Sequence, residues 1–205
     1  MRPLNLITFL KQHLGHVLTP DIVHDAVAAS MPARLIPKRP LPEPRNNGIF
    51  EVQVEHFRDI RDEVVPLMEA FWNTTRGAGT GIRPNVNVER YVFLEAIGQF
   101  YLVTLRADKK LVGYFGVQLT RDPLADLLVG YEDSLFIRAD YRKGHAASIL
   151  CRHAEEVAVA CGANRWRVTV KAGGAPDKIA SGLGAKVASI NLVKDIEQGE
   201  SNGLV

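Results

Sequence analysis

The strongest constraint on the fold comes from residues 131–171, where a strand pattern, a polar loop, a long helix pattern and a second strand pattern follow one another. The first strand is expected at about 131–138, and the helix begins after Gly144 and ends near Gly162. Its apolar face carries Ile149, Leu150, Ala154 and Val157. A strand–helix–strand unit closes with a right-handed crossover and two parallel strands, so these residues require a sheet with a helix packed on it.

The residues around this unit continue the alternation of strands and helices. Before it, the expected elements are a strand at 49–54, helices at 56–72 and 88–98, and strands at 100–106 and 110–119. After it, a short helix at 176–183 and a strand at 186–196 are expected. The order predicts an α/β fold (an α+β mixed sheet) at residues 49–197, followed by a flexible tail at 198–205. Ligands bind at the carboxyl ends of strands in open α/β sheets, so the polar loop after residue 138 is the expected binding site.

The first 48 residues predict an N-terminal interaction arm. Apolar residues at helical spacing in 4–18 indicate a short amphipathic helix, and Thr19-Pro20 starts a second helix that ends near Ser30. Residues 32–44 contain five prolines and are expected to form an extended connector. An arm of this size cannot bury its own apolar face. A neighbouring subunit, another protein or the domain itself would cover it, so self-association or a protein partner is expected through residues 1–45.

The composition favours a soluble, cytoplasmic protein. Apolar residues make up 46% of the chain, and every long apolar stretch is interrupted well before the ~18 residues that a membrane-spanning helix needs. The first twenty residues carry polar side chains where a secretory signal would be apolar. The net charge of +2 is too small to indicate nucleic acid. Neither a membrane nor a nucleic acid is therefore expected among the partners.

The two cysteines are expected to be free thiols. Cys151 and Cys161 lie on one predicted helix, where ten residues separate them by ~15 Å, which is beyond the reach of a disulfide. Neither cysteine has a close second cysteine or histidine pair, so the spacing of a zinc site is missing. No metal is expected.

A set of residues in the strand, loop and helix resembles a known family. The residues that carry the resemblance are Leu135-Phe136-Ile137, Tyr141-Arg142, the short basic loop, Leu150, Ala154-Glu155-Glu156, Ala158 and Gly162. Together they resemble the coenzyme-binding core of the GNAT superfamily of acetyl-CoA-dependent N-acetyltransferases, and the order of elements from residue 49 to 196 is similar as well. The resemblance implies a GNAT-like fold and acetyl-CoA as cosubstrate. Within the superfamily, the loop looks most like that of the proteins encoded by tailed bacteriophages.

The resemblance assigns the cofactor-binding residues. In the family, backbone amides of the loop and of the following helix hold the pyrophosphate of acetyl-CoA. The family pattern of Gln or Arg, two residues, Gly, one residue, and Gly or Ala falls here on Arg142, Lys143, Gly144, His145, Ala146 and Ala147. The central glycine is His145, so either its side chain stands close to the phosphate or the loop shifts by one residue and uses Gly144. The backbone of Leu135, Phe136 and Ile137 would pair with the pantetheine arm.

The catalytic residues are less complete than the cofactor site. A family Asn would fall near Gly174, and the Tyr that serves as general acid would fall at Ala180, so the acid has no evident occupant. The candidates for the general base are Glu132 and Asp133, because adjacent strand residues face opposite sides and one of them must face the active side. His145 is a third candidate, with a titration range suited to neutral pH.

Two functions follow from these observations. The first is transfer of an acetyl group from acetyl-CoA to a primary amine of unknown identity. The alternative is a catalytically degenerate GNAT-fold protein that acts as a structural or interaction component, for example of a phage particle, and docks through its N-terminal arm. Fold alone does not separate the two, because one fold hosts many functions.

Overall fold

The computed structural model describes residues 35–142 and 144–169, together with the isolated residues 15, 182, 184 and 186. The chain divides into two compact units at Thr169, and the helices and strands given below lie in the first unit. The expected helices at 4–18, 21–30 and 176–183 and the expected strand at 186–196 fall almost entirely outside the described residues. Lys143, Gly174 and Ala180 also lie outside them.

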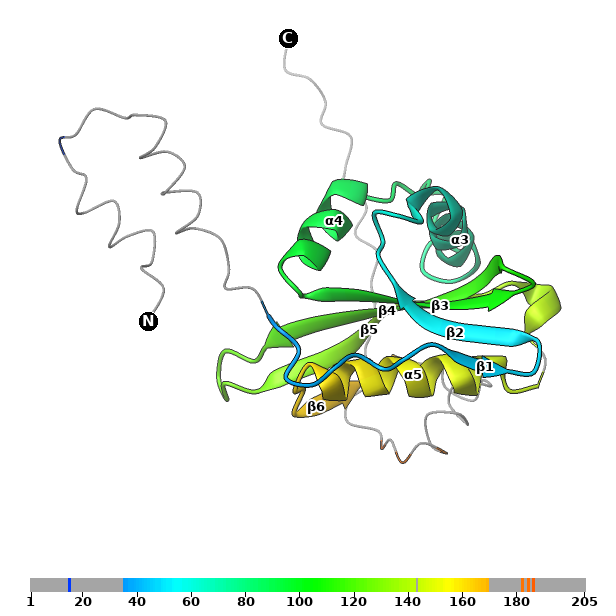
Figure 1. Cartoon of the computed structure of the whole chain (residues 1–205). Coiled ribbons are helices and arrows are strands. Elements are labelled where there is room, and N and C mark those ends of the chain that lie inside the picture. The colour runs from blue at the N-terminus through cyan, green and yellow to red at the C-terminus, as the bar shows by residue number, and fades with distance from the viewer. Residues whose placement is uncertain are drawn as a thin grey trace, which may run out of the picture. The chain divides into compact units, whose positions relative to one another are not determined.

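The described elements form one mixed sheet with helices on both faces (Figure 1). The strands are β1 (Arg45–Asn47), β2 (Phe50–Glu55), β3 (Phe100–Ala107), β4 (Lys110–Arg121), β5 (Leu128–Ile137) and β6 (Arg165–Arg167). The helices are α3 (Arg61–Thr74), α4 (Val88–Ala96), the short 3₁₀ turn η1 (Ala139–Tyr141) and α5 (Ala146–Ala160). The predicted mixed α/β architecture is confirmed.

The strands lie in chain order across the sheet, β1-β2-β3-β4-β5-β6. Neighbouring strands are antiparallel as far as β5, and β6 then pairs with β5 in parallel through the crossover helix α5. In Figure 1, α3 and α4 cover one face of the sheet and α5 covers the other. The predicted strand–helix–strand unit therefore forms the end of the sheet at which β5 and β6 meet.

Each face of the sheet has its own apolar packing. On the α3 and α4 face the core contains Phe57, Val64, Phe100 and Tyr114, all of them at most 1% exposed. On the other face α5 packs closely on β5, since a Cβ added to Gly130 would lie 2.9 Å from the Cβ of Ala158. Gly130 thus lets the crossover helix approach the strand.

Several element boundaries differ from the prediction. The strand β5 begins at Leu128 rather than near residue 131, because Leu128 and Val129 are buried and pair with β4. The helix α3 begins at Arg61 rather than at His56, because Phe57 is buried and its amide donates to Glu95 instead of joining the helix. The short strand β1 was missed, since its three exposed residues carry no apolar alternation.

The described part of the proline-rich connector is anchored to the domain. The amides of Lys38 and Arg39 both donate to the carbonyl of Ala160, and Leu35 donates to the carbonyl of Ile97. Further along, Arg45 forms an ion pair of 2.8 Å with Glu156 on α5. Residues 35–45 are therefore held against the domain by hydrogen bonds and charge, and the division at residue 48 stays a prediction.

Candidate active site

A β-bulge in β5 sets the geometry of the candidate site. The pairing of β4 with β5 passes from Gly116 opposite Ser134 to Val117 opposite Glu132, which leaves Asp133 without a partner. Bulges of this kind re-aim a side chain and are common beside active sites. The Asp133 side chain lies over Gly116. A Cβ atom added to Gly116 would be 3.3 Å from Oδ2 of Asp133 and 3.1 Å from the Phe100 ring. Gly116 therefore provides the space that the carboxylate occupies.

The Asp133 carboxylate is held by side chains from two elements. The hydroxyl of Tyr91 on α4 donates to Oδ2 over 2.9 Å, and the neighbouring Ser134 hydroxyl donates to the same atom over 3.1 Å. The guanidinium of Arg76, in the loop after α3, donates to the backbone carbonyl of Asp133 and also lies 5.4 Å from the centre of the Phe71 ring. Because these contacts come from separate elements, the position of the carboxylate depends on the packing of the whole α3 and α4 face.

Glu132 lies on the opposite face of the sheet. Its side chain is only 8% exposed, and its Oε2 atom accepts a hydrogen bond of 3.2 Å from the amide of Thr169. Burial raises the pKa of Glu132, while the Thr169 amide and Arg76 act in the opposite direction. The two acidic candidates therefore face different sides, as expected from their adjacent positions on one strand.

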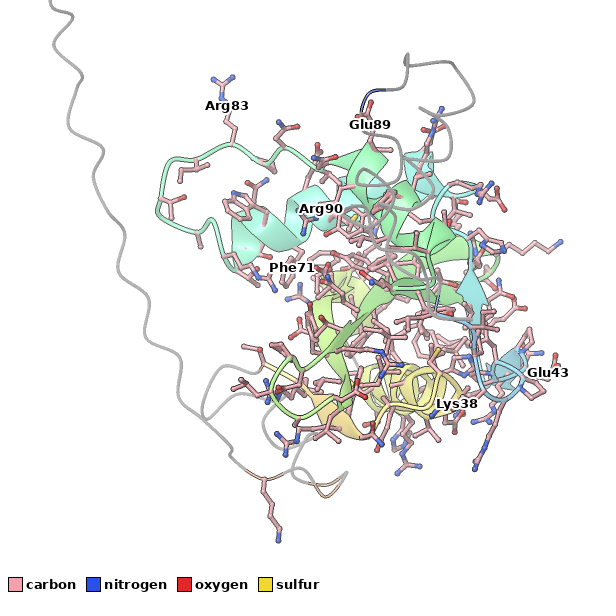
Figure 2. The ribbon with its side chains drawn as sticks, turned by 90° about the vertical axis from the view of Figure 1, so that its left-hand side faces the viewer. Lys38, Glu43, Phe71, Arg83, Glu89 and Arg90 are labelled. Carbon is pink, nitrogen blue, oxygen red and sulfur yellow. The ribbon has the colours of Figure 1, made fainter. Side chains whose placement is uncertain are left out.

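A cavity of about 470 Å³ opens beside Asp133 on the α3 and α4 face. Its walls come from the end of α3, the loop of residues 75–87, α4, β4 and β5. The charged and aromatic residues that matter below are Trp72, Arg76, Arg90, Tyr91, Tyr114 and Asp133. Figure 2 shows Arg90 on the side of α4 that faces α3, and Arg83 projecting outward from the loop between these helices. Asp133 lines the cavity, whereas Glu132 and His145 do not.

Two tyrosines supply neutral hydroxyl groups to this cavity. Burial raises the pKa of Tyr91, and the charge of Asp133 and the hydrogen bond to it add to the shift. Burial also raises the pKa of Tyr114, whose side chain is 0% exposed. The neighbouring Ser134 hydroxyl acts on the pKa of Tyr114 in the opposite direction, but the Tyr114 hydroxyl itself has no acceptor in hydrogen-bond geometry among the described residues. Both groups therefore remain protonated at neutral pH, and Tyr114 has a donor to offer.

The other side of the bulge is an open strand edge. The strand β6 pairs with β5 only from Val129 to Tyr131, so within residues 35–169 the edge of β5 from Glu132 to Ile137 has no partner strand. Arg138 donates its amide to Val112 of β4, so by alternation the backbone groups of Leu135 and Ile137 face the open edge. An extended molecule could pair with this edge as a further strand. The Ile137 carbonyl already accepts from Nε of Arg142 over 2.7 Å.

The loop after β5 leads into an uncapped helix. Gly144 has a φ of +64°, which favours glycine, and the exposed residue His145 is the N-cap of α5 without a capping hydrogen bond from its side chain. The first backbone bond of the helix runs from the amide of Ile149 to the carbonyl of His145. The amides of Ala146, Ala147 and Ser148 precede that bond and lie at the positive end of the helix dipole, where an anion is favoured, and no acceptor for them is found among the described residues.

The structure thus brings the predicted residues together in two groups. Arg142, Gly144, His145, Ala146 and Ala147 lie in the loop and helix start, and Leu135 to Ile137 form the adjoining strand edge. Asp133 belongs to the cavity on the other side of the bulge. Residues in the numbered ranges 35–142 and 144–169 include no cluster of three side chains able to hold a metal. Cys151 and Cys161 are buried free thiols, and no described helix is long and apolar enough to cross a membrane.

Sequence reasoning missed Tyr91, Tyr114, Arg76 and Arg90 as site residues. They come from α4, β4 and the loop after α3, and each has an ordinary place in the periodic pattern of its own segment. The one local signal was Gly116, since a glycine inside a strand often marks a bulge or a close approach. Their convergence on the cavity that Asp133 lines follows from tertiary packing.

Within residues 35–169, β5 and β6 pair only from Val129 to Tyr131, beside the start of α5 and a bulge that carries a carboxylate. Residues 65–176 match the model of the Acetyltransferase (GNAT) family, so the chain belongs to the GNAT acetyltransferase family. The residues that suggested this family in the sequence all lie in the matched segment.

Solved structures show the same fold at low sequence identity. A ribosomal-protein-alanine N-acetyltransferase from Brucella melitensis biovar Abortus 2308 is 17% identical, with a TM-score of 0.54, over 72% of this chain and 99% of that one. Glucosamine-6-phosphate N-acetyltransferase from Arabidopsis thaliana is 12% identical, with a TM-score of 0.57, over 72% and 99%. An aminoglycoside acetyltransferase from a soil metagenomic sample is 10% identical, with a TM-score of 0.57, over 73% and 97%. No curated protein matches the chain.

Proposed function

We propose that the protein transfers an acetyl group from acetyl-CoA to a primary amine. The observation that carries the proposal is the position of Asp133. This residue lies at the bulge of β5 and lines the cavity, and within residues 35–169 the same strand has an open edge from Glu132 to Ile137. The coenzyme would approach along that edge and the amine through the cavity. Membership of the GNAT family supports the choice of acetyl-CoA as the donor.

The coenzyme would be held by backbone groups and by the loop. The amides of Ala146 and Ala147 at the start of α5 would bind the pyrophosphate, with Gly144 supplying the left-handed turn that precedes them. The open edge at Leu135 and Ile137 would pair with the pantetheine arm. In this role Arg142 would exchange its bond to the Ile137 carbonyl for the phosphate, and the predicted contact of Lys143 would add a second positive charge.

The chemistry needs a base, a positioned amine and a proton donor. An ammonium group in the cavity would give a proton to Asp133, and the free amine would attack the thioester carbonyl. A C–N bond forms and the C–S bond breaks; the attacking nitrogen loses its second proton, and the sulfur leaves as a thiolate that takes up that proton. The Tyr114 hydroxyl, for which the described residues offer no acceptor, would donate to the developing oxyanion or to the sulfur, which supplies the donor that the sequence lacked at Ala180. We assign the base to Asp133 rather than to Glu132 or His145, because only Asp133 lines the cavity.

The first experiment measures coenzyme binding. Calorimetric titration of the protein with coenzyme A is expected to give saturable binding with one site, and acetyl-CoA is expected to raise the melting temperature through linkage. Arg142→Ala should abolish the rise, whereas the control Arg165→Ala, a loss of the same charge on β6, should keep it. No binding at millimolar coenzyme A would refute the proposal.

The second experiment tests the base. With an amine that the protein accepts, Asp133→Asn is expected to lower kcat by a factor of about 100 or more, which is the usual contribution of a general base. Binding of coenzyme A should change little, because Asp133 faces the cavity and not the loop. The control Asp140→Asn removes an exposed carboxylate in η1 and should leave kcat unchanged. Unchanged kcat in Asp133→Asn would assign the base elsewhere, with Glu132→Gln as the next variant.

One observation favours the alternative, a GNAT-fold protein without turnover. The Arg142 side chain is bound to the strand edge, through its Nε atom to the Ile137 carbonyl and 5.3 Å from the centre of the Phe136 ring. A loop that kept this arrangement would leave the edge closed to pantetheine. The protein would then act through its N-terminal arm as an interaction component, for example of a phage particle, and deletion of residues 1–34 would abolish binding to its partner. Saturable coenzyme A binding with turnover would exclude this alternative. The buried free thiols support the further proposal of a reducing, cytoplasmic setting.

A further inference from the structure

We infer that the acceptor is a small primary amine that also carries an anionic group, a carboxylate or a phosphate. The inference rests on the proposed function, since it assigns the acceptor of that same site. It starts from the charges around the 470 Å³ cavity, whose lining contains three arginines, Arg76, Arg83 and Arg90, and one carboxylate, Asp133. A cavity with such a lining attracts anions, because low-dielectric walls focus the field of the charges.

The three arginines form no ion pair with a carboxylate of the described residues, although the charge of Arg76 acts on Glu132. Arg106, by contrast, pairs with Glu55 and Glu63 at 2.8 and 2.9 Å. Asp133 offsets only one of the three positive charges of the lining, and its Oδ2 atom accepts from the neutral hydroxyl groups of Tyr91 and Ser134. The lining of the cavity therefore keeps an excess of positive charge.

The positions of the charges separate the two ends of the ligand. Asp133 lies on β5, at the floor, where the amine must meet the thioester. Arg76 is fastened beside it by its hydrogen bond to the Asp133 carbonyl and its contact with Phe71. Arg90 stands on α4, facing α3, and Arg83 projects from the loop (Figure 2). A ligand with an ammonium at Asp133 and an anion at Arg90 would match this order, with the field of Arg83 drawing it in.

The volume of the cavity and the positive charge of its lining disfavour acceptors that are large or that carry several positive charges. A volume of about 470 Å³ is that of a pocket for a small molecule. Trp72 donates its indole N–H to the carbonyl of Ile82 over 3.0 Å, which fastens the loop of residues 75–87 to the end of α3 at the rim. A polyamine or an aminoglycoside carries several ammonium groups, and all but one of them would face arginines. Such polycations are therefore expected to be poor acceptors.

The test compares matched amines that differ only in the anionic group. Initial rates are measured with saturating acetyl-CoA by release of the free thiol, for O-phosphoethanolamine against ethanolamine and for 3-aminopropanoate against 3-aminopropanamide. Because Cys151 and Cys161 are buried, the protein contributes little background to a thiol reagent. The anionic member is expected to have a kcat/KM at least about tenfold higher, the effect of one charge-assisted hydrogen bond. The amine pair with the larger ratio of kcat/KM, anionic over neutral, shows whether the site prefers a phosphate or a carboxylate.

A charge variant ties the preference to the cavity. Arg90→Gln is expected to reduce the ratio between anionic and neutral amine toward one, mainly by raising KM for the anionic member. The control Arg61→Gln removes the same charge from the first turn of α3, where Arg61 is exposed and contacts Asp62, and should leave the ratio unchanged. Equal rates for the two members of both pairs, or a ratio that Arg90→Gln does not change, would overturn the inference.

The failure of this inference differs from the failure of the proposed function. If coenzyme A binds and ethanolamine is acetylated as fast as O-phosphoethanolamine, the acetyltransferase proposal stands and the anionic acceptor is wrong. If coenzyme A does not bind, calorimetric titration of the full chain with O-phosphoethanolamine and ethanolamine decides. Binding of the first alone, weakened in Arg90→Gln, supports the anion site, and binding of neither overturns it.

Discussion

Replacing Gly116 by alanine tests whether the bulge positions the carboxylate. The new methyl group would lie 3.1 Å from Cε2 of Phe100, 3.2 Å from Cβ of Asp133 and 3.3 Å from its Oδ2 atom. These distances are a few tenths of an ångström shorter than ordinary carbon contacts, so Phe100 or Asp133 must move. Overpacking of this kind costs about 1–3 kcal/mol. For a domain of this size each kcal/mol lowers the melting temperature by roughly 2–4 °C.

The movable neighbour is Asp133, since Phe100 is 1% exposed and packed in the core. Displacing its carboxylate lengthens the 2.9 Å bond from Tyr91 and moves the proposed base. A misplacement of this size costs up to about 100-fold in rate. We therefore expect Gly116→Ala to lower kcat by one to two orders of magnitude while the protein stays folded.

The matched control is Gly130→Ala, on the opposite face. Its methyl group would meet Ala158 at 2.9 Å and Trp166 at 3.1 Å, far from the cavity lining. Both variants should lower the urea midpoint, and only Gly116→Ala should lower kcat beyond the fraction of unfolded protein. An active Gly116→Ala with normal kcat, or equal losses of kcat in the two variants, would refute the role assigned to the bulge.

Three further predictions concern single groups. Tyr91→Phe removes the hydroxyl that donates to Asp133, and it should cost about 1 kcal/mol in urea unfolding and lower kcat several-fold; unchanged values would contradict the hydrogen bond. Arg106→Gln leaves the partly buried Glu55 without its charged partner and should cost about 2 kcal/mol. Burial raises the pKa of Glu55, but the hydrogen bonds from Arg106 and Thr104 outweigh burial, so the net pKa is lowered. Stability should therefore fall as the pH drops below the ordinary glutamate range. This fall should be shallower in Arg106→Gln. Burial raises the pKa of Glu132, so the folded protein binds this proton more tightly than the unfolded chain, and stability falls as the pH rises through the glutamate range. Glu132→Gln should remove this fall, measured as the difference between the urea midpoints at pH 4 and pH 7. A fall that persists in the variant would assign the effect to another group.

Local periodicity was sufficient to predict most of the elements. The apolar spacing of Leu150, Ala154 and Val157 placed α5, and all three are buried as expected. Boundaries were missed where a tertiary partner outweighed the local pattern. Phe57 leaves the helix because its ring fills the core and its amide binds Glu95, a residue 38 positions away.

What the sequence by itself determined is the order of strands and helices, the GNAT family and the loop at Arg142 to Ala147. These features depend on residues that are close together along the chain, so an apolar periodicity or a short motif is enough to predict them. Only the tertiary structure decided which of Glu132 and Asp133 faces the cavity, and which side chains surround it. A bulge opposite Gly116 turns Asp133 toward Tyr91 and Arg76, and such a register shift arises from the pairing of two strands. The physical reason is that a period of two predicts alternation along one strand, whereas the extra residue appears only when the second strand is in place.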